Sequence, residues 1–418
     1  MKINEDIIIC VSYIILLFQQ AILHLLGDDT DYLFSYFDEV FIIILLIYII
    51  FKNNGKLRFR DTYDKKGMLF ATLFFLCGMM SSLIGAYQSV SVAIVDSYIC
   101  LKFYITYFCF KNLKKDAASN YLLLNKLCVV SKISIIVIFS IMVLDVAISI
   151  FPKPDVRYGI ESVQLFFGHP TFYAAACVTC VACLISGSSN KKSIIELLIV
   201  LGLVCCMMSL RIKAIGASLA ILLTYLYFIK MRGRNILFSC VVGGIIVLVV
   251  GYDQLSFYYG ENYLTDDNFV RARLLWDSIS IASLYFPLGS GFGTFGSDMS
   301  VKFFSPLYLQ YGYFDTKFLT DMFWPTVLAQ TGVLGLLCFL AILYNLIKNV
   351  FKIINYDVHA FCSSLSVLIY LLISSTGESA FFHPYSVAMF VIVGLDVGLC
   401  RQSYDGTQRE GIGKHFLQ

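Results

Sequence analysis

The side chains best suited to chemistry in this sequence are cations that interrupt apolar stretches or open helix-like runs. Arg211 and Lys213 break an apolar segment, and Arg271 and Arg273 begin the run Arg-Ala-Arg-Leu-Leu-Trp, which ends at Trp276. A charge next to lipid is costly and usually marks a functional cavity. Arginine binds phosphate through its planar fork and stays charged in any site. The pattern therefore predicts a phosphate-bearing ligand. The alternatives are side chains that extend to lipid headgroups and an ordinary amphipathic helix on the membrane surface.

Carboxylates and imidazoles near the same segments could accept a proton from a hydroxyl group. Asp321 lies where a long polar segment returns to an apolar run, while His169 and His383 each stand at the start of one. Arg157 adds a cation in another polar segment. Ion pairs with the arginines are the favoured alternative for most of the acids, which also include Asp38, Glu39, Asp96, Asp145 and Glu378.

Residues 287–296 form a glycine-rich segment, Pro-Leu-Gly-Ser-Gly-Phe-Gly-Thr-Phe-Gly. Residues 291–296 match the spacing GxGxxG, but no strand–helix–strand unit surrounds them, so a dinucleotide site is rejected. We expect a tight turn packed on the membrane part of the protein. The alternative is that exposed backbone amides contact an anion.

Three cysteines, Cys177, Cys180 and Cys183, have a spacing that resembles a metal site. Within a helix this spacing makes a single stripe, and a structural role is favoured. No cluster of histidines and carboxylates suggests a metal site, so neither a metal nor a cofactor is predicted.

The elements that must position these residues are expected to be membrane-spanning helices. Hydrophobic residues make up 59% of the 418 positions and charged residues only 14%, against about 25% charged residues in a soluble domain. A net charge of +3 does not indicate a nucleic-acid partner. The apolar runs are continuous rather than alternating, which favours helices over a β-barrel. The predicted class is an all-α polytopic membrane protein whose approximate spans are 6–26, 33–51, 67–86, 92–110, 127–151, 169–187, 193–209, 214–230, 236–252, 323–347, 359–377 and 385–400.

The distribution of cations predicts the orientation. With both termini in the cytoplasm, 22 of the 31 Lys and Arg residues fall inside, 8 fall outside and Lys102 lies within a span, as expected from the enrichment of cations in cytoplasmic loops. One outer loop is large, residues 253–322, and it belongs to a single membrane domain, residues 1–418. The first span is not read as a signal peptide, because Glu5 and Asp6 stand at its start and no small-residue cleavage site follows.

This combination resembles the O-antigen polymerase and O-antigen ligase superfamily of bacterial envelope biogenesis. The topology with one large outer loop carries the likeness, together with three local motifs. These are Arg271-x-Arg273-x-x-Trp276 followed by Pro287-Leu-Gly-Ser-Gly, Ser209-Leu-Arg211, and Leu328-Ala-Gln-Thr-Gly332-Val-Leu-Gly335.

Two positions separate the branches of this family. Ligases carry a histidine eleven residues before the glycine that matches Gly332, and Asp321 stands there in this sequence, which resembles a polymerase. Arg157 and Gly168, with ten residues between them, resemble a pattern described for polymerases, although the large loop does not repeat it.

The resemblance implies a metal-independent glycosyltransferase at the periplasmic face of the bacterial inner membrane. Its substrates would be a glycan chain as donor and a single repeat unit as acceptor. Each would be linked to undecaprenyl diphosphate, a lipid carrier in the membrane lipid. A chain-length regulator and a flippase are the implied protein partners. Asp321, His169 and His383 would be catalytic, and Arg157, Arg211, Lys213, Arg271 and Arg273 would bind the diphosphate and glycan. The alternatives are a secondary transporter or flippase of lipid-linked oligosaccharide, and an O-antigen ligase.

Overall fold

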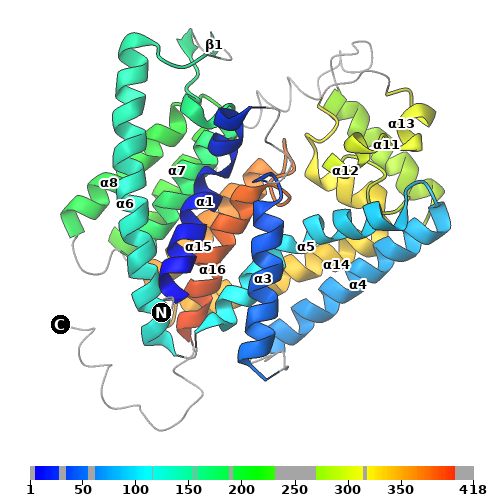
Figure 1. Ribbon diagram of the computed structural model, residues 1–418, viewed down its shortest axis with the longest axis horizontal. Helices are drawn as coiled ribbons and strands as arrows, with labels where there is room; N and C mark the ends of the chain where they lie inside the picture. The colour runs from blue at the N-terminus through cyan, green and yellow to red at the C-terminus, as the bar shows by residue number, and fades with distance from the viewer. Residues whose placement is uncertain are drawn as a thin grey trace.

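The computed structural model is a helical assembly (Figure 1) that describes residues 5–27, 34–54, 62–114, 116–153, 156–157, 159–187, 192–230, 270–313 and 318–400. The long helices are α1 (Glu5–Leu26), α3 (Phe37–Lys52), α4 (Thr62–Gly85), α5 (Val90–Leu113), α6 (Ala117–Ile148), α7 (Pro170–Ser186), α8 (Lys192–Met207), α9 (Ile212–Tyr225), α11 (Val270–Leu284), α14 (Phe323–Ile353), α15 (Val358–Ser374) and α16 (Pro384–Gly398). Short elements are β1 (Val156–Arg157), β2 (Ile160–Glu161), the 3-10 helix η1 (Leu165–Phe167), the π-helical turn η3 (Leu226–Lys230), α12 (Asp298–Lys302) and α13 (Pro306–Gln310).

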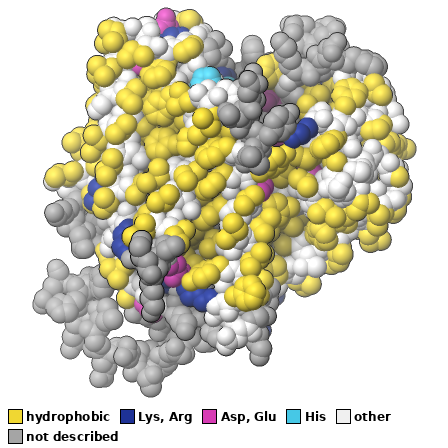
Figure 2. Space-filling view, in the orientation of Figure 1, with side chains coloured by type: hydrophobic (Ala, Val, Ile, Leu, Met, Phe, Trp, Pro, Cys, Tyr) yellow, Lys and Arg dark blue, Asp and Glu magenta, His cyan; other side chains and the backbone are white. Residues whose placement is uncertain are grey.

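A helix occupies eleven of the twelve positions predicted for membrane spans, and the twelfth, 236–252, lies outside the described residues. Within the described ranges, six helices are long and apolar enough to cross a membrane. Apolar side chains cover much of the surface in Figure 2; Ile44, Leu83 and Ile133 are 60%, 65% and 59% exposed. Because large apolar surfaces are stable only in lipid, the chain is a helical membrane protein.

Ion pairs join the helix ends that were predicted to share the cytoplasmic side. Lys52 Nζ lies 3.0 Å from Glu5 Oε1, while Lys114 and Lys126 reach Asp6 at 2.5 and 2.6 Å. Glu5 and Asp6 form the first turn of α1, where negative side chains also favour the helix dipole. The first helix is thereby joined to the ends of α3, α5 and α6.

The opposite end of the molecule carries residues 270–313, the main described part of the predicted large loop 253–322, which is called here the outer loop. Its helices α11, α12 and α13 lie together beside the ends of α4, α5 and α14 (Figure 1). They have a small apolar core of their own, which includes Leu274, Phe295, Leu307 and Tyr308. The outer loop is therefore a packed part of the fold over its described residues.

The glycine-rich segment docks into a break in α14. Gly332 has a φ of 67° and interrupts the helix, which frees carbonyl groups of the preceding turn. Ser290 and Gly291 donate their backbone N–H groups to the carbonyls of Ala329 and Gln330, each at 2.9 Å. A Cβ on Gly332 would lie 2.3 Å from the carbonyl carbon of Leu288. Two of the motifs found in the sequence thus form one interlocked element, in which protein groups satisfy the irregular backbone.

Candidate functional site

Arg211 and His169 meet at the beginnings of two neighbouring helices. Arg211 is the N-cap residue of α9 and His169 is that of α7. The apolar residues that follow each of them form the helix, and His169 and Arg211 lie at the outer ends of these helices. Arg211 Nη2 lies 3.5 Å from His169 Nε2. This contact brings together two side chains that are 42 positions apart in the chain.

The hydrogen bonding of His169 determines what its ring can offer. Its Nδ1 accepts the backbone N–H of Thr171 at 3.2 Å, so a neutral ring carries its proton on Nε2. Desolvation of the ring, with the nearby charges of Arg211 and Lys213, lowers the pKa of His169 to about 4. At neutral pH the ring therefore presents an N–H group beside the guanidinium. The guanidinium N–H is directed at Nε2, and an anionic oxygen placed between the two groups would accept from both.

Lys213, two residues after Arg211 at the start of α9, forms a buried ion pair with Glu378. Lys213 Nζ lies 2.6 Å from Glu378 Oε2, and the two side chains are 16% and 9% exposed. The hydroxyl of Tyr385 donates to the other oxygen, Glu378 Oε1, at 3.0 Å. Burial alone would raise the pKa of Glu378, but Lys213 and His383 together lower it. Glu378 is consequently a carboxylate at neutral pH.

Arg271 and Asp321 bring the outer loop to the same place. Arg271 Nη2 lies 2.6 Å from Asp321 Oδ2, with about a quarter of each side chain exposed. Arg271 and Arg211 are both near enough to Lys213 to interact with it electrostatically. Asp321 is not the N-cap of α14, which is Met322. The alternative of an ion pair with an arginine is the arrangement observed.

His383 completes the cluster. The ring of Phe172 packs between the two histidines, 5.8 Å from the His169 ring centroid and 5.4 Å from that of His383. Burial lowers the pKa of His383, although Glu378 and Asp298 oppose this effect. We call the group His169, Arg211, Lys213, Arg271, Asp321, Glu378 and His383 the outer site. Its residues come from α7, α9, α11 and the segments that precede α14 and α16.

Two predicted ligands of the anion are not joined to this cluster by any contact that the structure shows. Arg273 donates to the carbonyls of Tyr311 and Gly312 and lies over the ring of Tyr313, 4.4 Å from its centroid. These contacts hold the outer loop together. Arg157 lies in β1, but its side chain falls outside the described residues.

The glycine-rich segment binds protein groups rather than offering its amides to an anion. The backbone N–H of Phe292 donates to Ser82 Oγ at 2.8 Å, and that of Gly293 donates to Asp96 Oδ2 at 2.7 Å. Gly289 N–H donates to Ser81 Oγ at 3.2 Å. The predicted tight packing is confirmed, and the alternative of an anion site at these amides is wrong because they already have acceptors.

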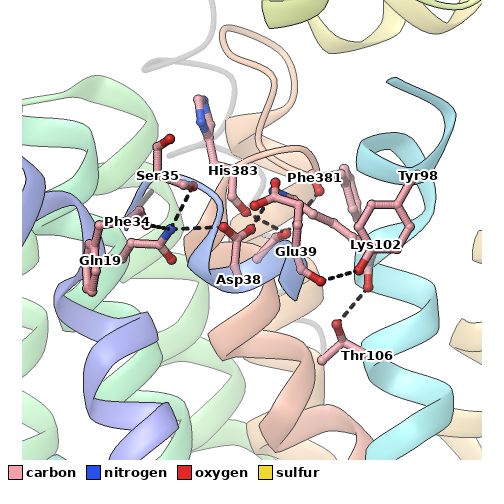
Figure 3. A network of polar contacts seen from close by, with 11 residues as sticks. Gln19, Phe34, Ser35, Asp38, Glu39, Tyr98, Lys102, Thr106, Phe381 and His383 are labelled. Atoms are coloured by element: carbon pink, nitrogen blue, oxygen red, sulfur yellow. Dashed lines mark hydrogen bonds and ion pairs between the residues drawn. The ribbon is translucent and has the colours of Figure 1, made fainter. Parts of the chain in front are cut away.

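A second charged cluster lies close to His383 and deeper among the helices (Figure 3). Lys102 Nζ lies 2.6 Å from Asp38 Oδ2 and 2.7 Å from Glu39 Oε1. Gln19 Nε2 donates to Asp38 Oδ1 at 2.9 Å. This cluster accounts for the cation predicted to lie within a span, and it links α1, α3 and α5.

Sequence reasoning did not find the partners within the outer site. Lys213 and Glu378 are 165 positions apart, and Arg271 and Asp321 are 50 apart, so no local pattern reveals either pair. Together the outer site has three described cations, two carboxylates and two imidazoles, which can bind an anion and accept a proton. Among the described residues, no three histidine, cysteine or acidic side chains are arranged to hold a metal. No family model matches the chain, and no curated protein matches it either.

Proposed function

We propose that this protein is a polysaccharide polymerase that joins oligosaccharide repeat units carried on undecaprenyl diphosphate. The observation that carries the proposal is the convergence of Arg211 and Lys213, at the start of α9, with Arg271 from α11 at the outer end. Such cations suit a diphosphate leaving group, whose negative charge grows as it departs. We further propose twelve spans, cytoplasmic termini and a location in the bacterial inner membrane, so that the outer site faces the periplasm.

The proposed reaction forms one glycosidic bond and breaks one bond to the diphosphate. The hydroxyl oxygen of a single lipid-linked unit attacks the anomeric carbon of the growing chain. The bond from that carbon to the diphosphate oxygen breaks, and undecaprenyl diphosphate leaves with the electron pair. Arg211 and His169, which lie together at the beginnings of α9 and α7, donate to the leaving group. The diphosphate linkage is already activated, so the reaction needs no nucleotide.

The proton of the attacking hydroxyl needs a base within the outer site. His383 is neutral at pH 7, because its pKa is lowered, and the residue is partly exposed. The carboxylate of Glu378 stabilises the positive charge that the ring gains. Asp321 was predicted to be catalytic together with His169 and His383, either orienting or deprotonating the hydroxyl. Its ion pair with Arg271 supports instead a role in holding the guanidinium in position.

Two arginines on one helix provide the sharpest test in cells. Arg271 faces Asp321, whereas Arg273, two residues further along α11, contacts the outer loop. We expect Arg271→Ala to abolish polymer while leaving single-unit product and protein level unchanged. Arg273→Ala is the matched control and should retain polymer at a stability cost. Loss of polymer only in Arg273→Ala would contradict the assignment.

Asp321→Asn distinguishes the polymerase from the ligase. Asparagine keeps the size of the side chain and can still accept one hydrogen bond from Arg271, but it cannot form an ion pair. We expect short polymer or single units, still transferred to lipid A, because a separate ligase performs that step. Loss of the single-unit product would identify this protein as the ligase instead.

The transporter alternative draws support from one observation, the cluster of Lys102, Asp38 and Glu39 deep among the helices. Transporters place ionisable groups near the middle of the bilayer. Lys102→Met combined with Asp38→Asn separates the two functions. A flippase would leave lipid-linked units on the cytoplasmic face, whereas the proposed polymerase variant would still accumulate them on the periplasmic face.

A further inference from the structure

The glycine-rich segment of the outer loop reaches past the outer ends of the membrane-spanning helices. The ring of Phe292 packs against that of Phe74, with centroids 5.6 Å apart. Phe74 stands eleven positions before Gly85, the last residue of α4. At about 1.5 Å per residue this is roughly 16 Å, against about 30 Å for the hydrocarbon core of a bilayer. The side chain of Phe292 is therefore directed toward the middle of α4.

The backbone of the same segment is bonded to membrane-spanning helices. All five N–H groups of residues 289–293 donate to acceptors on these helices, which are the carbonyls of Ala329 and Gln330 in α14, the hydroxyls of Ser81 and Ser82 in α4, and the carboxylate of Asp96 in α5. The carbonyl of Pro287 accepts the N–H of Leu334 in α14 at 3.3 Å. Irregular backbone occurs at membrane depth only where protein groups satisfy it in this way.

The apolar residues just before this segment are exposed. Leu284 and Phe286 are 71% and 70% exposed, and Tyr285 between them packs against Tyr87, just beyond the end of α4. Leu334, which is bonded to the backbone of the next residue in the chain, is itself 43% exposed on α14. The exposed end of α11 is therefore continuous with the lipid-facing surface of α4 and α14.

The exposed face of α11 is apolar, and its hydroxyl groups are satisfied within the helix. Trp276 and Ile279 are 53% and 41% exposed on this face. Ser280 and Ser283 are also exposed, and their hydroxyls donate to the carbonyls of Trp276 and Ile279 at 3.1 and 2.8 Å. The charged side chain at the beginning of the face, Arg273, is directed to carbonyls of the outer loop. Such a face suits contact with lipid, which offers no hydrogen-bond partners.

We propose that residues 284–293 enter the bilayer as a re-entrant element and that Leu284 and Phe286 contact lipid acyl chains. From there α11 leads back to Arg271 in the outer site, so Trp276 lies nearer the headgroups, where aromatic rings favour the interface. The large loop predicted to lie outside the membrane is then partly within it. This inference does not depend on the function proposed for the outer site.

The test is fluorescence quenching of a single tryptophan in lipid nanodiscs that hold the full chain. The protein has two tryptophans, so Trp276→Phe with Trp324→Phe removes the native signal and Phe286→Trp supplies the probe. Phosphatidylcholine with brominated acyl chains quenches from the lipid, and iodide quenches from the water. We expect the brominated chains to remove most of the emission of Phe286→Trp and iodide to leave it almost unchanged.

Leu309→Trp in the same background is the matched control. Leu309 is 50% exposed on α13, whose buried residues Leu307 and Tyr308 belong to the core of the outer loop. Iodide should quench this tryptophan, and brominated chains should not. Equal quenching of both probes by brominated chains would place the whole outer loop on the membrane surface and overturn the re-entrant arrangement.

Two other outcomes would also overturn the proposal. Quenching of Phe286→Trp by iodide rather than by brominated chains would place this residue in water. Protection from both quenchers would show that protein covers it, such as a second copy of the chain. Should Phe286→Trp fail to fold, Leu284→Trp in the same background carries the same expectations.

Discussion

Removal of the negative charge of Glu378 should destabilise the protein more than removal of its partner Lys213. The two charged atoms lie 2.6 Å apart and both side chains are largely buried. At an effective dielectric constant of about 20, their attraction is roughly 6 kcal/mol before the cost of desolvation. Loss of one partner from a buried pair costs about 3–5 kcal/mol, because the other charge remains buried.

The surroundings make the two losses unequal. With Lys213→Met, Glu378 keeps the hydrogen bond from Tyr385, so we expect a loss of about 3 kcal/mol. With Glu378→Gln, the ammonium remains close to Arg211 and Arg271 without its carboxylate. We expect a loss of about 4–5 kcal/mol. The double variant should lose at least about 2 kcal/mol less than the sum of the single losses.

The assay is reversible unfolding in mixed detergent–SDS micelles, followed by tryptophan fluorescence, for the wild type and the three variants. The difference between the single variants reports the neighbouring arginines together with the hydrogen bond from Tyr385, since both variants break the same ion pair. A smaller loss for Glu378→Gln than for Lys213→Met would refute the arrangement of cations in the outer site. Additive losses in the double variant would show that the ion pair contributes nothing.

Three further predictions follow from single contacts. Arg211→Lys should abolish polymer almost as fully as Arg211→Ala, because a point charge lacks the guanidinium fork; polymer of normal length in cells would contradict this. The pKa of His169 is about 4 in the folded protein instead of 6.5. Between pH 6.5 and 4, the histidine is therefore protonated in the unfolded chain but neutral in the folded chain. Stability should therefore fall as pH falls through that window, and unfolding curves of His169→Gln should lack this component. Gly332→Ala should cost more than about 2 kcal/mol in the same unfolding assay, because its φ is positive and its Cβ would overlap Leu288. The control Gly377→Ala has open space and should cost little.

Most of the helical fold could be predicted because each span is a local property of the chain. About 20 consecutive apolar residues suffice to indicate one membrane helix, and all eleven spans in the described part of the chain coincide with helices. The break in α14 could not be placed in this way. It depends on Gly332 together with the backbone of residues 287–291, which supply the partners for the freed carbonyls.

The candidate site could be predicted in its residue types but not in its pairs. Arg211, Lys213 and Arg271 stand out in the sequence because charges near lipid are rare. The pairing of Lys213 with Glu378 is a tertiary contact that no spacing reveals. Arg271 and Arg273 were both predicted to bind the diphosphate. Two positions along a helix turn a side chain by about 200°, which explains why only Arg271 faces Asp321.

The measurement that tests the central claim most directly uses purified protein in nanodiscs with one synthetic repeat unit on undecaprenyl diphosphate. Mass spectrometry of the lipid-linked products would follow the reaction over time. We predict products with two or more repeat units on one lipid, with one undecaprenyl diphosphate released for each bond formed, and no such products from Arg211→Ala. Unchanged substrate from the folded wild-type protein would contradict the polymerase, and movement of intact substrate across the bilayer would identify a transporter instead.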